Sequence, residues 1–203
     1  MTLKDRIIRL IETGGPIPVS TYMQLALHDS AQGYYATRPG LGTDFITAPE
    51  VSQVFGELIG LWVVNEWRAM GAPDSFHLVE IGPGRGTLMA DALRLAYVAG
   101  GREFADAAKL TLVEPSPELR KVQAERLSDY TPSFADTLGN VPAGPMILVA
   151  NEYLDCLPAR QFRKADGQWR ECVVGLDADG ALAFGLAADE QRAPDGAAET
   201  SEA

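Results

Sequence analysis

The residues with the clearest chemical potential form a short run in which an apolar segment meets three glycines. The run is HLVEIGPGRGTL, residues 77–88, and it places Gly82, Gly84 and Gly86 at alternate positions. A strand that turns through glycines into a helix lets the backbone approach a ligand closely, and the helix presents free N–H groups at its positive end. The run therefore predicts a site for a phosphate, a dinucleotide or the adenosyl group of a methyl donor.

The residues that follow the glycines discriminate between these three ligands. A phosphate loop requires Gly-Lys and then Ser or Thr at the start of the helix, whereas Gly86 is followed by Thr87 and Leu88. A dinucleotide fingerprint requires glycine or alanine where Thr87 stands, and an acid about twenty residues later. The acid that ends the next apolar run is Glu114, 28 residues after Gly86. The pattern favours S-adenosylmethionine, which has no pyrophosphate, and disfavours a nicotinamide-dependent oxidoreductase.

Glu114 has a specific role in the methyl-donor hypothesis. A carboxylate at the end of the second strand can accept hydrogen bonds from both hydroxyls of a ribose, because these two donors lie side by side. Two alternatives stay open, namely a tight turn without a ligand for the glycines and a solvated strand end for Glu114. The combination of the glycines with Glu114 favours the ribose contact.

The elements that must position these residues alternate along the chain. Apolar spacing predicts helices near residues 3–13, 21–29, 50–70, 87–100 and 116–127, and buried strands at 76–81, 109–115 and 145–152, with a weaker strand near 132–136. This alternation predicts a mostly parallel α/β sheet with helices on both faces. Residues 169–176 and 181–187 predict a β-hairpin that turns at Asp179-Gly180. Trp62 and Trp67 are expected in the core.

Four blocks of sequence carry a family resemblance. They are GYY at 33–35, GTDFITAPEVSQVFGELIGLW at 42–62, VEIGPGRGTLMAD at 79–91 and NEYLDCLPARQF at 151–162. With these blocks the chain resembles the MidA/NDUFAF-seven family of S-adenosylmethionine-dependent methyltransferases, whose mitochondrial members are associated with assembly of respiratory complex I. The second block discriminates best, because glycine-rich turns occur in many families.

The resemblance implies a fold, a cofactor and a substrate. The fold is a Rossmann-like class I methyltransferase sheet with an N-terminal helical extension, the cofactor is S-adenosylmethionine, and the substrate is an arginine of a protein, in particular a respiratory complex subunit. It also implies that Glu80 lies beneath the glycines and that Glu114 binds the ribose. The remaining residues implied around the donor are Gly82, Pro83, Gly84, Gly86, Asp44, Phe45 and Thr47.

The segment NEYLD begins at the carboxyl end of a predicted parallel strand, and ligands of open α/β sheets bind at that edge. Methyl transfer is an in-line displacement that requires an aligned nucleophile. A guanidinium nucleophile needs carboxylates to hold it, because arginine pairs bidentately with them. The candidate catalytic residues are therefore Asn151, Glu152 and Asp155. A salt bridge for Glu152 and a turn cap for Asp155 are the alternatives. The side chains of Glu50, Gln53 and Glu57 share one helix face. This face is either solvated or an acidic wall of the substrate cleft.

The sequence predicts four parts. Residues 1–72 form an extension that covers the donor pocket, 73–165 the donor-binding core, 166–186 the hairpin, and 187–203 a disordered acidic tail. A class I sheet has seven strands and only four precede the hairpin, so the sheet is expected to be incomplete at its C-terminal side, with strand 145–152 as an unpaired edge. A non-catalytic binding or assembly module is therefore the alternative to an active enzyme.

Composition narrows the class of protein. The chain has 46% hydrophobic and 22% charged residues, as in ordinary globular proteins, and its net charge of −11 argues against a nucleic-acid-binding surface. The N-terminus predicts neither a secretory signal nor a membrane span. Cys156 and Cys172 form no metal-binding motif, so no metal site is expected. We expect a cytoplasmic protein, and a homo-oligomer stays open.

Overall fold

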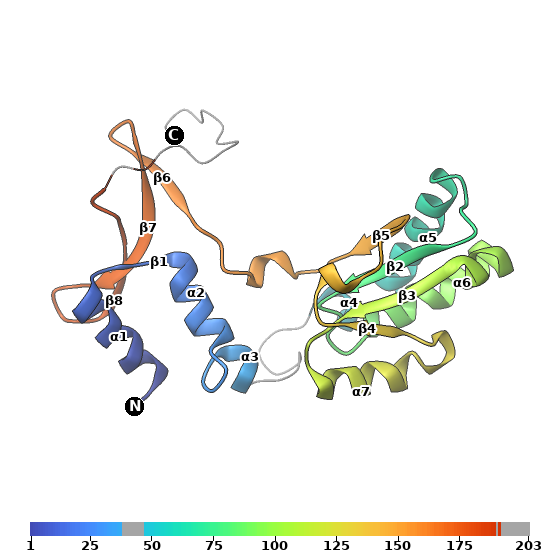
Figure 1. Cartoon of the computed structure of the whole chain (residues 1–203), viewed down its shortest axis with the longest axis horizontal. Helices are drawn as coiled ribbons and strands as arrows, with labels where there is room; N and C mark the ends of the chain where they lie inside the picture. Colours follow the sequence, from blue (N-terminus) through green and yellow to red (C-terminus); the bar gives the residue numbers. More distant parts are fainter. Residues whose placement is uncertain (38–46, 190, 192–203) are drawn as a thin grey trace. The chain divides into compact units, whose positions relative to one another are not determined.

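The computed structural model describes residues 1–37, 47–189 and 191 (Figure 1). The chain forms two compact units. One unit combines Met1–Pro39 with Cys156–Ala203, and the other is Gly40–Asp155. The second unit contains the glycine turn, Glu114 and the NEYLD segment at 151–155.

The second unit is built on a four-stranded parallel sheet. Its strands are β2 (Phe76–Ile81), β3 (Ala108–Val113), β4 (Ser133–Ala135) and β5 (Met146–Val149), in the spatial order β4-β3-β2-β5. The order reverses between β2 and β5, so the carboxyl ends of these two strands flank a topological switch point, where α/β proteins bind ligands. The predicted parallel sheet is confirmed, and within the described residues β5 pairs with β2 alone, as expected for an edge strand.

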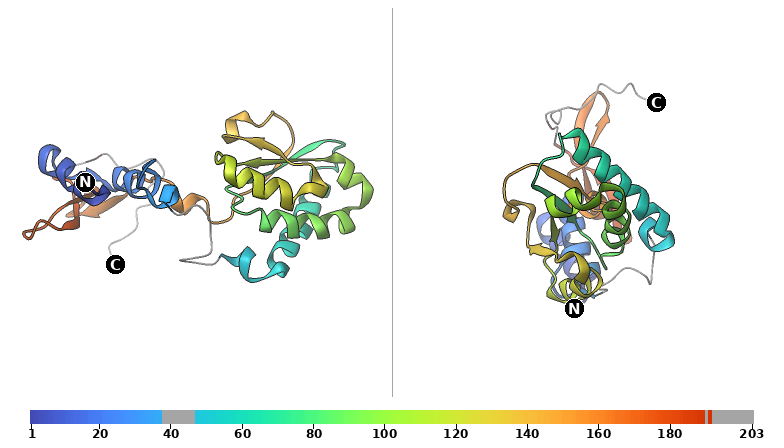
Figure 2. Two further views of the ribbon diagram at one scale, coloured as in Figure 1. Left: turned by 90° about the horizontal axis from the view of Figure 1, so that it is seen from below. Right: turned by 90° about the vertical axis from the view of Figure 1, so that its right-hand side faces the viewer.

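Helices pack against one face of this sheet. They are α5 (Gln53–Ala69), α6 (Thr87–Ala107) and α7 (Pro117–Arg126), and the short helix α4 (Ala48–Val51) contacts α5 and α6. Figure 2 shows α6 and α7, in green and yellow-green, on the same side of the strands. The main core lies on this face and includes Phe76, Leu78 and Phe104.

The opposite face of the sheet has a smaller core. Val79, Ile81, Val113 and Ala135 form it, and Val141, Met146 and Tyr153 pack against them. The crossover from β4 to β5 on this side contains the 3-10 helix η2 (Leu138–Asn140). Helices on both faces are expected from the sequence, but no α-helix of the described residues contributes to this second cluster.

Helix α5 leaves several of its large apolar side chains exposed. Val63 and Trp67 are buried, whereas Leu58 and Trp62 are 59% and 45% exposed. The expectation that Trp62 lies in the core is therefore wrong. The buried face contains Gly56 and Gly60, and these glycines let the backbone of α6 approach closely. We call the exposed apolar side chains of α4 and α5 the α5 stripe, which consists of Val51, Val54, Leu58, Leu61 and Trp62.

The other unit contains an antiparallel sheet and short helices. The strands are β1 (Ile17–Pro18), β6 (Phe162–Ala165), β7 (Gln168–Leu176) and β8 (Leu182–Leu186), in the order β1-β7-β6 with β8 also on β7. The helices are α1 (Leu3–Gly14), α2 (Val19–His28) and α3 (Tyr34–Thr37). The hairpin between β7 and β8 is confirmed, and Asp177 stabilises its turn by accepting hydrogen bonds from the N–H groups of Asp179 and Ala181. Strands β1 and β6 were not predicted.

The compact units do not follow the four predicted parts. Helices α4 and α5 belong to the same unit as the parallel sheet, although the predicted boundary at residue 72 separates them from it. A role for residues 1–72 in covering a donor pocket stays a prediction. Most of the predicted acidic tail lies outside the described residues, but Gln191 pairs with Trp169 in an antiparallel bridge. No helix in the described part of the chain has the length and apolarity that crossing a membrane requires.

Candidate functional site

The glycine turn connects the end of β2 to the start of α6. Gly82, Gly84 and Gly86 have φ angles of 66°, 54° and 77°, which lie in the left-handed region. Glycine adopts this region without steric cost, whereas other L-residues pay roughly 1–2 kcal/mol. The Gly86 N–H donates to the Pro83 carbonyl at 2.7 Å, and α6 begins at Thr87. The predicted strand–turn–helix is therefore present, and the first N–H groups of α6 lie beside the carboxyl edge of the sheet.

Tyr153 brings the second predicted group of residues to this turn. A Cβ atom placed on Gly82 would lie 2.7 Å from Cδ2 of Tyr153, so the aromatic ring packs directly on the glycine. Tyr153 follows β5, and Gly82 follows β2. The glycine turn and the NEYLD segment therefore meet at the switch point between these two neighbouring strands.

Glu80 is a buried carboxyl group in β2, two residues before the first glycine of the turn. Its residue is only 2% exposed, and Oε2 has no hydrogen-bond partner within the described residues. Burial raises the pKa of Glu80 to about 8, so the carboxyl is mostly protonated at neutral pH. An unpaired buried polar atom is costly and is a common property of functional sites.

We expect Glu80 to make stability depend on pH. Because its pKa in the folded chain lies above the usual 4.5, the unfolded chain loses the proton first, and stability falls as pH rises from about 4.5 to about 8. The slope from this group is at most about 1.4 kcal/mol per pH unit. Denaturant unfolding of wild type and Glu80→Gln at several pH values measures it, and the variant should lose less stability over this range.

The exposed Glu125 of α7 provides the matched control for this measurement, because Glu125→Gln also removes one carboxylate. This control should follow the wild-type curve. Parallel curves for wild type and Glu80→Gln between pH 5 and 8 would show that Glu80 is already ionised in the folded chain.

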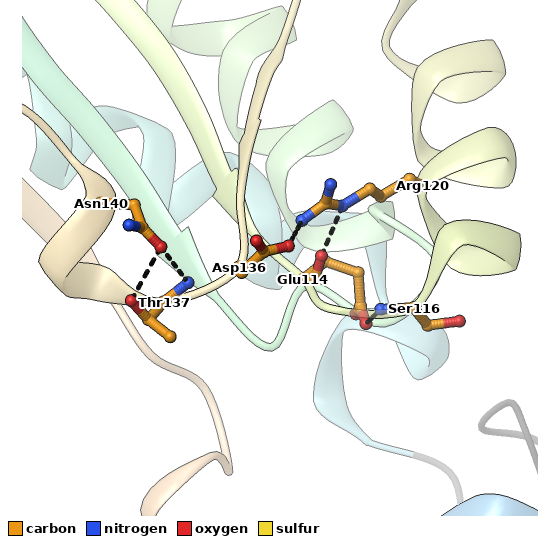
Figure 3. Close-up of polar contacts among 6 residues, drawn as sticks. All are labelled: Glu114, Ser116, Arg120, Asp136, Thr137 and Asn140. Atoms are coloured by element: carbon orange, nitrogen blue, oxygen red, sulfur yellow. Dashed lines mark hydrogen bonds and ion pairs between the residues drawn. The ribbon is translucent and has the colours of Figure 1, made fainter.

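Glu114 follows β3 directly and accepts hydrogen bonds from three donors. Its carboxylate accepts a hydrogen bond from the Ser116 N–H at 2.8 Å, and its carbonyl accepts one from Nε of Arg120 (Figure 3). The carboxylate also accepts a hydrogen bond from Nε2 of Gln123 at 3.5 Å. The residue is 6% exposed. Burial raises the pKa of Glu114, and the hydrogen bonds from Ser116 and Gln123 oppose this shift. The carboxylate is therefore fixed in orientation at the carboxyl edge of the sheet.

Arg120 extends this network to the next strand. Its guanidinium also donates to Oδ1 of Asp136 at 2.7 Å, and Asp136 follows β4. Beyond it, Oδ1 of Asn140 accepts hydrogen bonds from the hydroxyl and the N–H of Thr137 (Figure 3). The sequence-based prediction of site residues missed Arg120, Gln123 and Asp136. One signal was available for Asp136, because it directly follows the weak strand predicted near 132–136 and so belongs to the same sheet edge.

The N-terminal block contributes a contact to the glycine turn. The Thr87 hydroxyl donates to Oε1 of Glu50 at 2.7 Å, which links α4 to the first residue of α6. Thr47 is 7% exposed and precedes α4, and its carbonyl accepts the Glu50 N–H at 2.9 Å. Asp44 and Phe45, which the resemblance also places at the donor, lie outside the described residues. Thr47 is therefore three residues from a side chain that contacts the turn.

Glu50, Gln53 and Glu57, which were predicted to share one helix face, form contacts with α6 or with one another, and a role for them in a substrate cleft stays a prediction. Glu50 is bound to Thr87, as described above. Glu57 forms an ion pair with Arg94 at 2.9 Å and accepts a hydrogen bond from Gln53. These side chains therefore join α4 and α5 to α6.

The predicted catalytic residues follow β5. Asn151 is half-buried, whereas Glu152 and Asp155 are exposed, with Asp155 in the 3-10 helix η3 (Leu154–Cys156). Glu152 has a φ angle of 49°, which is uncommon for a residue with a Cβ atom. Strained backbone of this kind clusters at functional sites. No ion pair between described residues involves Glu152, so its alternative role in a salt bridge gains no support.

Comparison with known proteins adds relatives and solved structures. The Drosophila melanogaster protein arginine methyltransferase NDUFAF7 homolog, mitochondrial, is 40% identical over an alignment that covers 89% of this chain and 46% of that protein. The Danio rerio protein arginine methyltransferase NDUFAF7, mitochondrial, is 38% identical, with 86% and 47% covered. This chain therefore spans about half the length of the curated relatives it matches. The predicted cytoplasmic location is wrong by this comparison, because these relatives are named as mitochondrial proteins.

A solved structure and a family model agree with the relatives. A COG1565 superfamily protein from Burkholderia thailandensis, crystallised with S-adenosyl-homocysteine, superposes with a TM-score of 0.71 at 30% identity, over 91% of this chain and 49% of that one. A family model described as "Putative S-adenosyl-L-methionine-dependent methyltransferase" matches residues 58–202. Because that match spans most of the sequence, the chain belongs to this family of S-adenosyl-L-methionine-dependent methyltransferases.

Proposed function

We propose that this chain binds S-adenosylmethionine at the glycine turn and acts in methyl transfer to an arginine of a protein. One observation carries the proposal. Three glycines with positive φ at alternate positions follow β2, and a buried carboxylate held in a fixed orientation, Glu114, follows the adjacent strand β3. A turn without a ligand would not require a buried carboxylate beside it, and the family membership of the chain supports the same ligand.

The residues present fit an adenosyl methyl donor. The glycines leave the turn without side chains, so a ligand can approach the backbone and the first N–H groups of α6. Glu114 retains acceptor capacity for the two hydroxyls of a ribose, since a carboxylate offers about four acceptor sites. Oε2 of Glu80, two residues before the turn, has no partner among the described residues and is free to form a hydrogen bond with the donor. Roles for Asp44 and Thr47 in covering the donor stay predictions.

Bound S-adenosylmethionine supplies a methyl group on a positively charged sulfur. The task of the chain is then to align a guanidinium nitrogen opposite that sulfur and to hold its charge. Glu152 and Asp155 are the carboxylates for this task, because arginine pairs with carboxylates through two parallel hydrogen bonds. Asn151 follows β5 at the same edge and would orient the substrate. The relatives are named protein arginine methyltransferases, which supports this substrate class.

Two narrower predictions go beyond these observations. A respiratory complex subunit as the substrate, with a link to complex I assembly, stays a prediction from the family resemblance. A binding or assembly module without transfer is the second candidate, and the exposure of both Glu152 and Asp155 favours it, because neither carboxylate lies in a walled pocket in the described structure.

Calorimetric titration of the purified chain with S-adenosylmethionine tests the proposal. Wild type should bind, and Glu114→Gln should bind about 10- to 100-fold more weakly, because hydrogen bonds to a charged group contribute about 1.5–3 kcal/mol. Glu125→Gln on the exposed side of α7 is the matched control and should bind like wild type. A folded wild-type chain that does not bind S-adenosylmethionine contradicts the proposal. Binding without transfer of labelled methyl to any arginine-containing protein selects the second candidate.

Glu152→Gly should separate stability from function. Glycine tolerates the φ angle of 49° at this position, so the substitution should raise the free energy of unfolding by up to about 1 kcal/mol. Methyl transfer should fall at least tenfold while donor affinity stays near wild type. Denaturant unfolding and a methyl-transfer assay measure the two effects, and Asp166→Gly, at another non-glycine residue with positive φ, is the control that should gain stability without losing transfer. Full activity in Glu152→Gly would remove Glu152 from the catalytic residues.

A further inference from the structure

Gln123 lies between the two parts of the proposed donor site. It belongs to α7 and is 0% exposed. Its Nε2 donates to the carbonyl of Gly84 at 2.7 Å and approaches Oε2 of Glu114 at 3.5 Å. One side-chain amide therefore contacts both the glycine turn after β2 and the carboxylate after β3.

A buried amide at this position needs an explanation. Oε1 of Gln123 has no hydrogen-bond partner in the described part of the chain, and an unsatisfied buried acceptor destabilises a fold. The aliphatic part of the side chain packs near Gly86 beside Leu127, so an apolar residue of similar length, such as methionine, would fill the same space. Packing alone does not require glutamine here.

Helix α7 is also anchored without Gln123. Leu127, at its C-terminal end, is 0% exposed, and Ser116 caps its N-terminus by accepting the Leu119 N–H. Arg120 binds both the Glu114 carbonyl and Asp136. Other residues therefore already hold α7 in place.

We propose that Gln123 is a positioning residue that couples the glycine turn to Glu114. Its Nε2 donates one hydrogen to the Gly84 carbonyl and the other to the Glu114 carboxylate. This fixes the distance between the backbone that receives the adenosyl ligand and the carboxylate that accepts the ribose hydroxyls. The inference rests on the proposed function, and it makes Gln123 a determinant of ribose recognition without contact to the reacting atoms.

The test measures selectivity for ribose and not affinity alone. Calorimetry compares S-adenosylhomocysteine with its 2′-deoxy analogue on wild type and on Gln123→Met. Wild type should prefer the ribose ligand about 10-fold or more, since the analogue leaves Glu114 one hydrogen bond short. In Gln123→Met the preference for the ribose ligand should fall to about 3-fold or less, because no side chain then holds the Glu114 carboxylate at a fixed position relative to the glycine turn. Glu125→Gln, on the exposed side of the same helix, should keep the wild-type ratio.

A purely structural role for Gln123 gives a different result. It would lower the unfolding midpoint and weaken both ligands equally, so that the ratio stays at the wild-type value, and this outcome overturns the inference. If Gln123→Met fails to fold by circular dichroism, Gln123→Leu provides the same test with a smaller apolar side chain that also lacks the amide hydrogens. A wild-type chain that binds both ligands equally also overturns the inference. A wild-type chain that binds neither ligand overturns the proposed function as well.

Discussion

Gly82→Ala is expected to lower the affinity for S-adenosylmethionine about 100-fold and to destabilise the unit formed by residues 40–155. The φ angle of 66° costs an alanine roughly 1–2 kcal/mol. The new methyl group would also lie 2.7 Å from Cδ2 of Tyr153 and 3.4 Å from Cε2, so the turn or the ring must move. Because the proposed ligand contacts the backbone of this turn, a shift of the turn breaks these contacts, and a loss of about 2.8 kcal/mol of binding free energy lowers affinity about 100-fold. Calorimetry and denaturant unfolding measure the two effects.

Two control variants separate the causes in this experiment. Gly71 has a φ angle of 87°, and no atom lies within 4 Å of the position that a Cβ atom would take there. Gly71→Ala should therefore lose stability through backbone strain alone and should bind the donor normally. Adding Tyr153→Ala to Gly82→Ala removes the clash and leaves the strain, so any recovery of binding measures the contribution of the ring. Normal donor binding by Gly82→Ala would show that the ligand site lies elsewhere.

Gly60→Ala should cost the same unit about 3 kcal/mol or more in the free energy of unfolding, at or above the upper end of ordinary overpacking. A Cβ atom at Gly60 would overlap the carbonyl oxygen of Ala92 and lie 2.8 Å from its carbonyl carbon, so α5 and α6 must separate. Helix propensity alone predicts the opposite sign, because alanine is about 1 kcal/mol better than glycine within a helix. The sign of the measured change therefore decides which effect dominates.

Gly139→Ala is the matched control in the same unit. A Cβ atom there would meet only Oγ1 of Thr137, at an ordinary 3.7 Å, so the change in stability should be small. Thermal unfolding followed by circular dichroism is sufficient for the comparison. A Gly60→Ala variant as stable as wild type would mean that α5 and α6 are less closely packed than the structure shows.

The sequence predicted the elements that depend on strong local patterns. The apolar runs at 76–81 and 109–115 became β2 and β3, and the glycines between β2 and α6 could be recognised because the left-handed conformation has few other occupants. Glu114 was identifiable since a parallel sheet brings consecutive strand ends to one edge. These features require only the neighbouring residues and the topology of the sheet.

Other features depended on contacts that periodicity does not encode. The buried face of α5 was chosen by the close approach of Gly56 and Gly60 to α6, which leaves larger apolar residues such as Trp62 in solvent. Gln123 lies in a helix of mostly polar residues, where nothing in the sequence distinguishes the one side chain that is fully buried. The engagement of Glu50 by Thr87 joins residues 37 positions apart, so it could only be found in three dimensions.

The α5 stripe contains a tryptophan, Trp62, whose fluorescence reports on whether the stripe is covered. Trp62 is 45% exposed on the stripe, whereas Trp67 on the same helix is 4% exposed in the core. Acrylamide should quench the emission of Trp62 and leave that of Trp67 nearly untouched. The third tryptophan, Trp169 of β7, is half-buried, so the two populations are resolved in a Trp169→Phe background. Any protein surface that comes to rest on the stripe would shield Trp62 and move its emission to shorter wavelength. The fluorescence spectrum of the chain can therefore be used to screen for whatever covers α5.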